Sequence, residues 1–176
     1  MKVILVEGFK DELTPDMKYY AFDWDDNLMF MPTQIILKDS DGKEVGMGTE
    51  DFAEHRMKIG KEDFEYKGKT IVGFAENPFR NFSEQGNKKF IIDSLLAKTG
   101  PAWDDFVECI NGGSIFSIIT ARGHSPETIK QAIENLIEVG YKGLSKKELV
   151  YNLKKYRELA GEEELSDSEL PTIKLI

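Results

Sequence analysis

The sequence predicts an α/β fold in which parallel strands are joined by helices that cover both faces of a sheet. Short apolar and β-branched runs at 19–22, 114–119 and 172–176 have the length of buried strands. Segments whose apolar residues recur every three or four positions lie between them, as in helices with one buried face. A chain of 176 residues, 40% hydrophobic and 31% charged, suits one elaborated globular domain.

The first half of the chain mixes strands with one helix. Strands are predicted at three apolar or β-branched runs: 2–6, 19–22 and 70–74. Residues 34–48 form two extended runs around a turn containing Asp-Gly, which is typical of a β-hairpin. Thr49 is expected to cap a helix from Glu50 to Lys58, and the Asn, Pro, Gly and Ser residues of 76–87 predict a loop.

The second half alternates helices with strands. Helical spacing and terminal Ser, Pro or Gly residues predict four helices: 88–98, 101–110, from Ser125 to Gly140, and from Ser145 to Gly161. Ser125 is expected to be an N-cap, with Pro126 at the first helical position. The run from Ser114 to Ile119 is short enough for a buried parallel strand, and 171–176 predicts a last strand.

Charge and cysteine content narrow the classes of protein. A net charge of −9 argues against non-specific binding to nucleic-acid backbones, which requires Lys and Arg to displace counterions. Cys109 is the only cysteine, so no internal disulfide is expected. No apolar run approaches the roughly 20 residues that span a bilayer, and the N-terminus lacks the apolar region of a secretion signal. We therefore expect a cytoplasmic protein outside the membrane.

An acidic cluster follows the strand predicted at 19–22. In the segment Asp23 to Leu28, extended geometry directs Asp23 and Asp25 to one side and Trp24 to the other. Two carboxylates this close repel each other unless a cation separates them or one is protonated, and Mg²⁺ is the natural cation. One carboxylate could then attack phosphorus while the other transfers a proton. The alternative is a solvated acidic turn that caps the next element.

A second polar cluster follows the strand predicted at 114–119. Thr120 lies at the tip of that strand, and Ala121 and Arg122 begin a Gly-containing turn before a helix. A hydroxyl and free backbone N–H groups in such a turn suit an anion such as phosphate. Taken alone, the pattern fits equally well a strand end with Arg122 as a surface cation. His124 is expected to be a surface-loop histidine.

The two clusters together, in this order, resemble the haloacid dehalogenase-like (HAD) superfamily of phosphatases and phosphotransferases. Phe22 to Leu28 matches the family's Asp-x-Asp motif after an apolar strand, and Ile118 to Arg122 looks like its second motif. The resemblance implies a Rossmann-like parallel sheet with helices on both faces, plus a β-hairpin flap and a small α+β cap insertion. It covers 1–176 as a single domain, in which 34–48 suits the flap, and the flap and cap together occupy approximately 28–100.

The resemblance also implies roles for individual residues. Asp23 would be the nucleophile that forms an aspartyl-phosphate, and Asp25 the general acid and base. Thr120 would hydrogen-bond the transferring phosphoryl group, with Ala121 and Arg122 beside it in the substrate-binding loop. The family's Mg²⁺ is bound by the first Asp side chain and the main-chain carbonyl of the second, which makes Asp23 and Asp25 the metal positions. A phosphorylated small molecule, a nucleotide or a nucleic-acid end would be the substrate.

The chain departs from the family pattern in three places. Asn27 replaces the usual Thr or Val, and the family's basic residue is not assigned, although Lys146 and Lys147 at a helix start are candidates. No acidic pair follows a later strand, because Asp167 precedes the last apolar run. We therefore expect either a sequence truncated before that motif or a divergent, catalytically weak member. Motif order favours the enzyme, and the missing acids favour a non-catalytic domain for binding or assembly.

Overall fold

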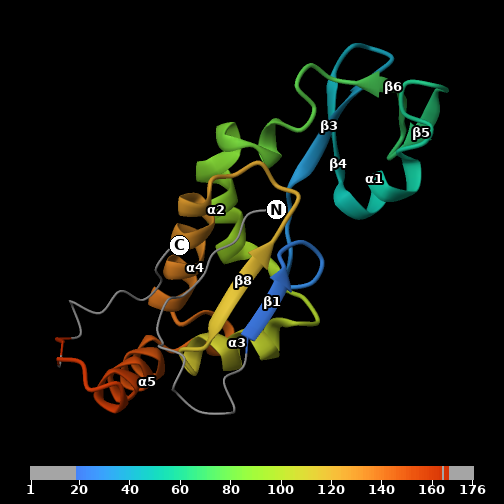
Figure 1. The fold of residues 1–176 in the computed structure, drawn as a ribbon. Coiled ribbons are helices and arrows are strands. Elements are labelled where there is room, and N and C mark those ends of the chain that lie inside the picture. The colour runs from blue at the N-terminus through green and yellow to red at the C-terminus, as the bar shows by residue number, and fades with distance from the viewer. Residues whose placement is uncertain (1–18, 164, 167–176) are drawn as a thin grey trace. The chain divides into compact units, whose positions relative to one another are not determined.

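The computed structural model describes residues 19–163 and 165–166, which form a mixed α/β protein. Figure 1 shows the course of the chain. The described residues divide into two compact units. Unit 1 comprises 19–31, 94–121 and the residues from 125 onward, and unit 2 comprises Pro32–Asp93 and Arg122–His124. The strands predicted at 2–6 and 171–176 lie outside the described residues.

Unit 1 contains two parallel strands, β1 (Tyr19–Asp23) and β8 (Ile115–Ile119), which lie side by side (Figure 1). Within the described part of the chain they form a two-stranded sheet. Asp23 is opposite Ile119 at the carboxyl end of the pair. Both strand predictions are confirmed to within a residue, because short apolar runs bounded by polar residues are a strong local signal.

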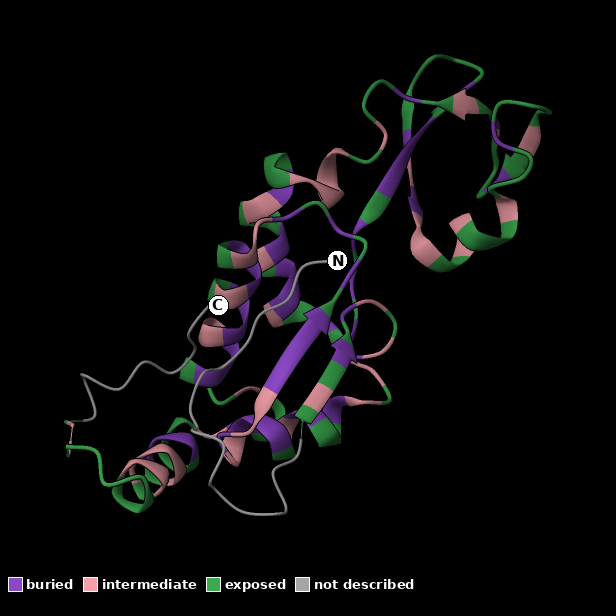
Figure 2. Cartoon of the chain, in the orientation of Figure 1, coloured by how far each residue is buried: buried purple, intermediate pink, exposed green. Residues whose placement is uncertain are grey.

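Helix α3 (Trp103–Asn111) covers one face of these two strands. The ring of Phe106 meets Phe22 edge to face at 5.3 Å and Phe116 at 5.9 Å. All three side chains are buried, and Figure 2 shows β8 buried along most of its length. Such edge-to-face pairs add about 0.5–1.5 kcal/mol each to the stabilisation from burial. This aromatic cluster fixes α3 against the sheet.

The next two helices of unit 1 begin at the predicted caps. In α4 (Pro126–Glu138), the Ser125 hydroxyl accepts the Thr128 N–H at 3.3 Å. In α5 (Lys146–Leu159), the Ser145 hydroxyl accepts the Glu148 N–H at 3.2 Å. Both caps satisfy N–H groups that a helix leaves without intrahelical partners. No helix in the described part of the chain is long and apolar enough to cross a membrane.

The helix predicted over 88–98 is too long at its C-terminal end. Helix α2 is Asn87–Leu96, and the next residues form β7 (Lys98–Thr99), which pairs antiparallel with β2 (Met29–Phe30). Apolar periodicity cannot register this pairing, because the partner strand is distant in the sequence. Backbone hydrogen bonds to that partner replace the last helical turn.

Unit 2 contains a four-stranded antiparallel sheet in the order β4-β3-β6-β5. Its strands are β3 (Gln34–Asp39), β4 (Glu44–Gly48), β5 (Phe64–Tyr66) and β6 (Lys69–Phe74). The hairpin predicted at 34–48 and the strand predicted at 70–74 are confirmed, whereas β5 was not predicted. One core cluster unites the sheet: Ile35, Leu37, Val45, Met47, Ile59, Tyr66 and Ile71.

The helix that follows the hairpin is shorter than predicted. Helix α1 is Thr49–His55, its N-cap is Gly48, and no side chain caps it, so the predicted cap at Thr49 is wrong. Thr49 already belongs to the helix because the extended backbone of β4 ends one residue earlier. The predicted loop at 76–87 contains two short 3₁₀ turns, η1 (Arg80–Phe82) and η2 (Glu84–Gly86). A third, η3 (Tyr141–Gly143), connects α4 to α5.

The single cysteine provides a test of the unit 1 core. Cys109 is fully buried in α3, and this burial, with a smaller contribution from the charge of Glu108, raises its thiol pKa to about 12. At pH 8 only about one thiol in 10,000 would be ionised, and the thiolate is the reactive form. Native protein should therefore react with an aromatic disulfide reagent far more slowly than urea-unfolded protein. Equal rates for the two states would contradict this packing.

Candidate active site

The parallel pairing of β1 and β8 brings the two predicted motifs to one edge of the sheet. The carboxyl ends of parallel strands point the same way, and the Trp24 N–H donates to the carbonyl of Ile119 at 3.2 Å. Asp23 ends β1, and Thr120 directly follows β8. The structure therefore brings together, within unit 1, two clusters that lie far apart in the sequence.

The acidic loop, defined here as Asp23–Leu28, is closed by its own backbone. Leu28 N–H donates to the carbonyl of Asp23 at 3.1 Å, and Met29 N–H donates to the carbonyl of Trp24 at 3.0 Å. Asp26 takes a left-handed conformation with φ of 59° to allow this tight return. The loop leads directly into β2 and not into a helix, so the alternative of an acidic helix cap is wrong.

Burial alternates along the first residues of the acidic loop. Trp24 is 1% exposed and anchors the loop in the core, whereas Asp23 is exposed and Asp25 is half-buried. This is the alternation expected of an extended segment whose carboxylates share one side. Thr120 is buried and Ala121 is exposed. Acidic groups are therefore accessible to solvent beside a buried hydroxyl-bearing residue.

The electrostatics of the loop favour a cation. Loss of water around the Asp23 carboxyl group is the largest effect that raises its pKa, and the negative charge of Asp25 raises it further. A backbone hydrogen bond from Trp24 opposes these effects, and the charge of Asp26 adds to them. A carboxylate that its neighbours destabilise in this way gains from any positive charge placed beside it.

The oxygen atoms of the acidic loop are the donors available to such a cation. Among the residues that the structure describes, no three His, Cys, Asp or Glu side chains gather into a metal-binding group. Asp23 and Asp25 offer two carboxylates, and the buried Asn27 Oδ1 has no hydrogen-bond partner. Two carboxylates and neutral oxygens suit Mg²⁺, which needs few protein ligands and retains water molecules.

Arg122 lies in unit 2, whereas Thr120 and Ala121 lie in unit 1. It is only 4% exposed, and its Nη2 donates to the hydroxyl of Thr33 at 3.1 Å. The guanidinium lies over the rings of Phe82 and Phe90, at 4.7 and 5.3 Å from their centroids. The alternative of Arg122 as a surface cation is therefore wrong. Stacking between aromatic rings stabilises a buried guanidinium because the ring faces carry partial negative charge.

His124 is also buried, contrary to the expected surface-loop histidine. It is 0% exposed, stacks on Phe90 with ring centroids 4.5 Å apart, and has its Nδ1 2.8 Å from Asn87 Oδ1. Between it and Arg122, the Gly123 N–H donates to the carbonyl of Phe82 at 2.6 Å. Residues 122–124 thus form an anchor in unit 2. Their sequence, Arg-Gly-His, carries no apolar pattern that would have predicted burial.

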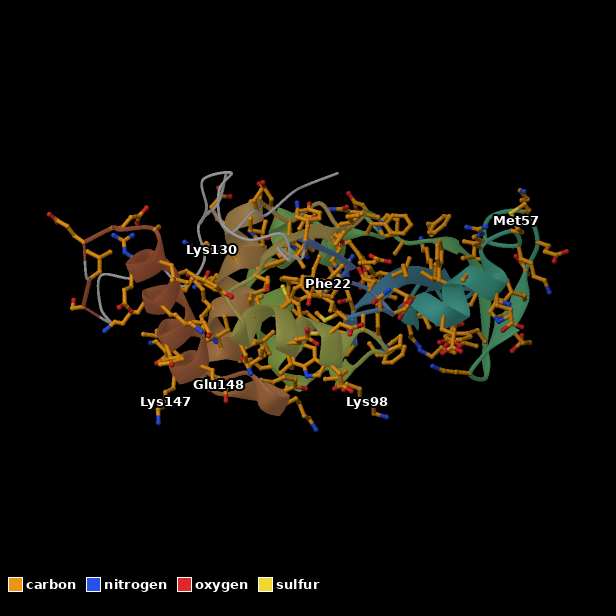
Figure 3. All side chains as sticks on the ribbon, turned by 60° about the horizontal axis from the view of Figure 1, so that its bottom comes forward. Phe22, Met57, Lys98, Lys130, Lys147 and Glu148 are labelled. Carbon is orange, nitrogen blue, oxygen red and sulfur yellow. The ribbon has the colours of Figure 1, made fainter. Side chains whose placement is uncertain are left out.

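The lysines considered for charge neutralisation lie away from Asp23. Asn111, the last residue of α3 before β8, accepts the Ser145 N–H at 2.8 Å and donates to the carbonyl of Gly143 at 3.0 Å. The start of α5 is thus held beside the amino end of β8, at the edge opposite Thr120. Lys146 pairs there with Glu138, and Lys147 points away from the ribbon in Figure 3. A helix that follows a parallel strand returns the chain to the opposite edge.

A segment that the sequence did not single out also contacts the acidic loop. The Gly100 N–H donates to the carbonyl of Leu28 at 2.8 Å, and the Ala102 N–H donates to the carbonyl of Asn27 at 3.1 Å. The Gly-Pro pair at this point signals an irregular backbone, although nothing in the sequence identifies its partner. We name Gly100–Ala102 the brace.

The anchor at 122–124 should stabilise unit 2. Replacing Arg122 with Ala removes two ring contacts and leaves the buried Thr33 hydroxyl without this donor. We expect the free energy of unfolding to fall by about 2–4 kcal/mol in urea titrations followed by circular dichroism. The exposed Arg56 in unit 2 provides the control, because its replacement with Ala should change stability by only about 0.5 kcal/mol. Similar losses for both variants would contradict the anchor.

No protein-family model, curated protein or solved structure matches the chain. Any function must therefore be argued from the two motifs and from the geometry that joins them.

Proposed function

We propose that the chain is a cytoplasmic, Mg²⁺-dependent phosphohydrolase of the HAD-like type that acts through an aspartyl-phosphate on Asp23. The observation that carries this proposal is the parallel pairing of β1 with β8, which puts Asp23 and Thr120 at one edge of a sheet. Ligands of α/β folds collect at that edge. The substrate would be a phosphorylated small molecule, a nucleotide or a nucleic-acid end.

The proposal assigns a place in the fold to each unit. β1 and β8 would be neighbouring strands of a Rossmann-like sheet with helices on both faces, and α3 already covers one face. The hairpin of β3 and β4 would be the flap, and the rest of unit 2 the cap insertion. The main segment of unit 2, Pro32–Asp93, falls inside the predicted insertion at about 28–100. In this arrangement the cap would determine substrate choice.

The chemistry proposed for the acidic loop uses two carboxylates in turn. An ionised Asp23 oxygen attacks phosphorus, and the bond to the ester oxygen breaks as Asp25 gives that oxygen its proton. Asp25 then removes a proton from water, which attacks the aspartyl-phosphate and releases inorganic phosphate with Asp23 restored. The exposure of Asp23 and the half-buried position of Asp25 support this division of roles.

Mg²⁺ would be held by the Asp23 side chain and the main-chain carbonyl of Asp25. The crowded negative charge of the acidic loop and the unsatisfied Asn27 Oδ1 support this assignment. When bound, Mg²⁺ would neutralise charge on the phosphoryl oxygens. Thr120 would donate a hydrogen bond to the same group, and backbone N–H groups after β8 would complete an anion-binding turn.

Replacing Asp23 with Asn should abolish hydrolysis of 4-nitrophenyl phosphate in the presence of Mg²⁺, because the amide cannot form the covalent intermediate. Release of 4-nitrophenol measures the rate. Asp104, exposed in the first turn of α3, supplies a matched control, and its replacement with Asn should leave turnover unchanged. The proposal fails if the Asp23 variant turns over as fast as the wild-type protein.

Replacing Thr120 with Val keeps the shape of the side chain and removes its hydroxyl. If that hydroxyl stabilises the transition state, kcat for the same substrate should fall by about 100-fold. Replacement of Thr70 by Val on β6 is the control for this exchange and should leave kcat unchanged. An unaltered kcat in the Thr120 variant would remove this residue from the proposed mechanism.

A non-catalytic binding or assembly domain is the second candidate. The position of Lys146 and Lys147 at the opposite edge favours it, because the charge on a transferring phosphoryl group would then lack these cations. Beryllium fluoride with Mg²⁺ mimics an aspartyl-phosphate and separates the two candidates. An Asp23-dependent rise in melting temperature supports the enzyme. No rise, combined with no turnover, supports the binding domain.

A further inference from the structure

The acidic loop is held from two sides within unit 1. On one side, Trp24 is buried and donates its N–H to the carbonyl of Ile119 on β8. On the other side, the brace donates two backbone hydrogen bonds to the carbonyls of Asn27 and Leu28, at 3.1 and 2.8 Å. The pairing of β2 with β7 continues this contact beyond the loop. The acidic residues therefore occupy a segment that is fixed at both ends.

Gly100 is the point of closest approach between the brace and the acidic loop. A Cβ atom at Gly100 would lie 2.1 Å from the carbonyl oxygen of Asn27, 2.7 Å from its carbonyl carbon and 3.2 Å from that of Leu28. The first two distances are far below van der Waals contact, and all three atoms belong to the backbone, so no side-chain rotation could relieve the overlap. Glycine is required here because two backbones touch.

A displacement at this contact would reach the proposed nucleophile directly. The Leu28 N–H donates to the carbonyl of Asp23 at 3.1 Å, and Asp25 pairs with Met29 across the loop. A shift of Asn27 and Leu28 away from the brace therefore shifts the backbone that carries both carboxylates. Trp24 cannot follow that shift freely, because it is packed in the core with 1% exposure.

We propose that Gly100 is a positioning residue for the Asp23 and Asp25 carboxylates. This assignment deepens the proposed function and depends on it for the meaning of the position that is held. A side chain at residue 100 forces the acidic loop to move by about 1 Å, and misplacement of reacting groups by that distance costs about 100-fold in rate. Gly100 touches the loop backbone and not the reacting atoms, so it acts through Asn27 and Leu28.

The kinetic test compares Gly100→Ala with Gly48→Ala. The control is matched because a Cβ at Gly48 meets nothing within 4 Å and its φ of −66° suits alanine. With 4-nitrophenyl phosphate and Mg²⁺, Gly100→Ala should lower kcat by about 10- to 100-fold and leave KM within about threefold, and the control should match the wild type. An unchanged kcat in Gly100→Ala would overturn the proposal.

A structural measurement separates this inference from the proposed function. In Gly100→Ala, the amide NMR signals of Asp23, Asn27 and Leu28 should shift, while those of Ile35 and Leu37 in unit 2 should not. If the wild-type protein shows no Asp23-dependent turnover, the proposed function fails, and these shifts still decide whether Gly100 positions the loop. Unshifted loop signals would refute the positioning role.

Ala102→Pro provides a second variant for the case in which Gly100→Ala does not fold. It removes the N–H that bonds to the carbonyl of Asn27 without inserting an atom beneath the acidic loop. Its φ of −91° lies near the range of proline, and the position directly precedes α3. A kcat lowered about fivefold or more with KM unchanged supports the brace, and a wild-type kcat overturns it.

Discussion

The parallel pairing of β1 with β8 is the interaction on which the proposed site depends. Neither strand alone presents more than one of the two motifs, and the register that sets Asp23 opposite Ile119 determines which residues become neighbours. A one-residue slip would turn Phe22 and Ile118 out of the core and the carboxylates into it. The burial of these apolar side chains against α3 therefore sets the position of the polar ones.

Local signals in the sequence were sufficient for much of unit 1. The β1 and β8 runs and the Ser125 and Ser145 caps follow from residue types within a few positions of one another, so they could be predicted. Strand β7 could not, because its hydrogen-bond partners lie in β2. The brace was missed for the same reason: its partners are backbone carbonyls, which no side-chain pattern records.

Side-chain chemistry near Thr120 was harder to anticipate. Arg122 has the sequence context of a solvent-exposed cation, yet ring contacts with Phe82 and Phe90 and a hydrogen bond to Thr33 keep it inside unit 2. A buried guanidinium requires such partners to offset its loss of water. Helix α4 likewise determines the place of Lys146, because its length returns the chain to the far edge of the sheet. Proximity in sequence was a poor guide in both cases.

Unit 2 is discontinuous along the chain, and this has a consequence for biosynthesis. Its sheet is encoded early, but the anchor at 122–124 is made only after α2, α3 and β8. A nascent chain that ends before Arg122 lacks the groups that fill the space between Phe82 and Phe90. Domains generally fold as units during synthesis, N-terminal first. Here the earlier unit reaches its final packing only once the strand of the other unit has left the ribosome.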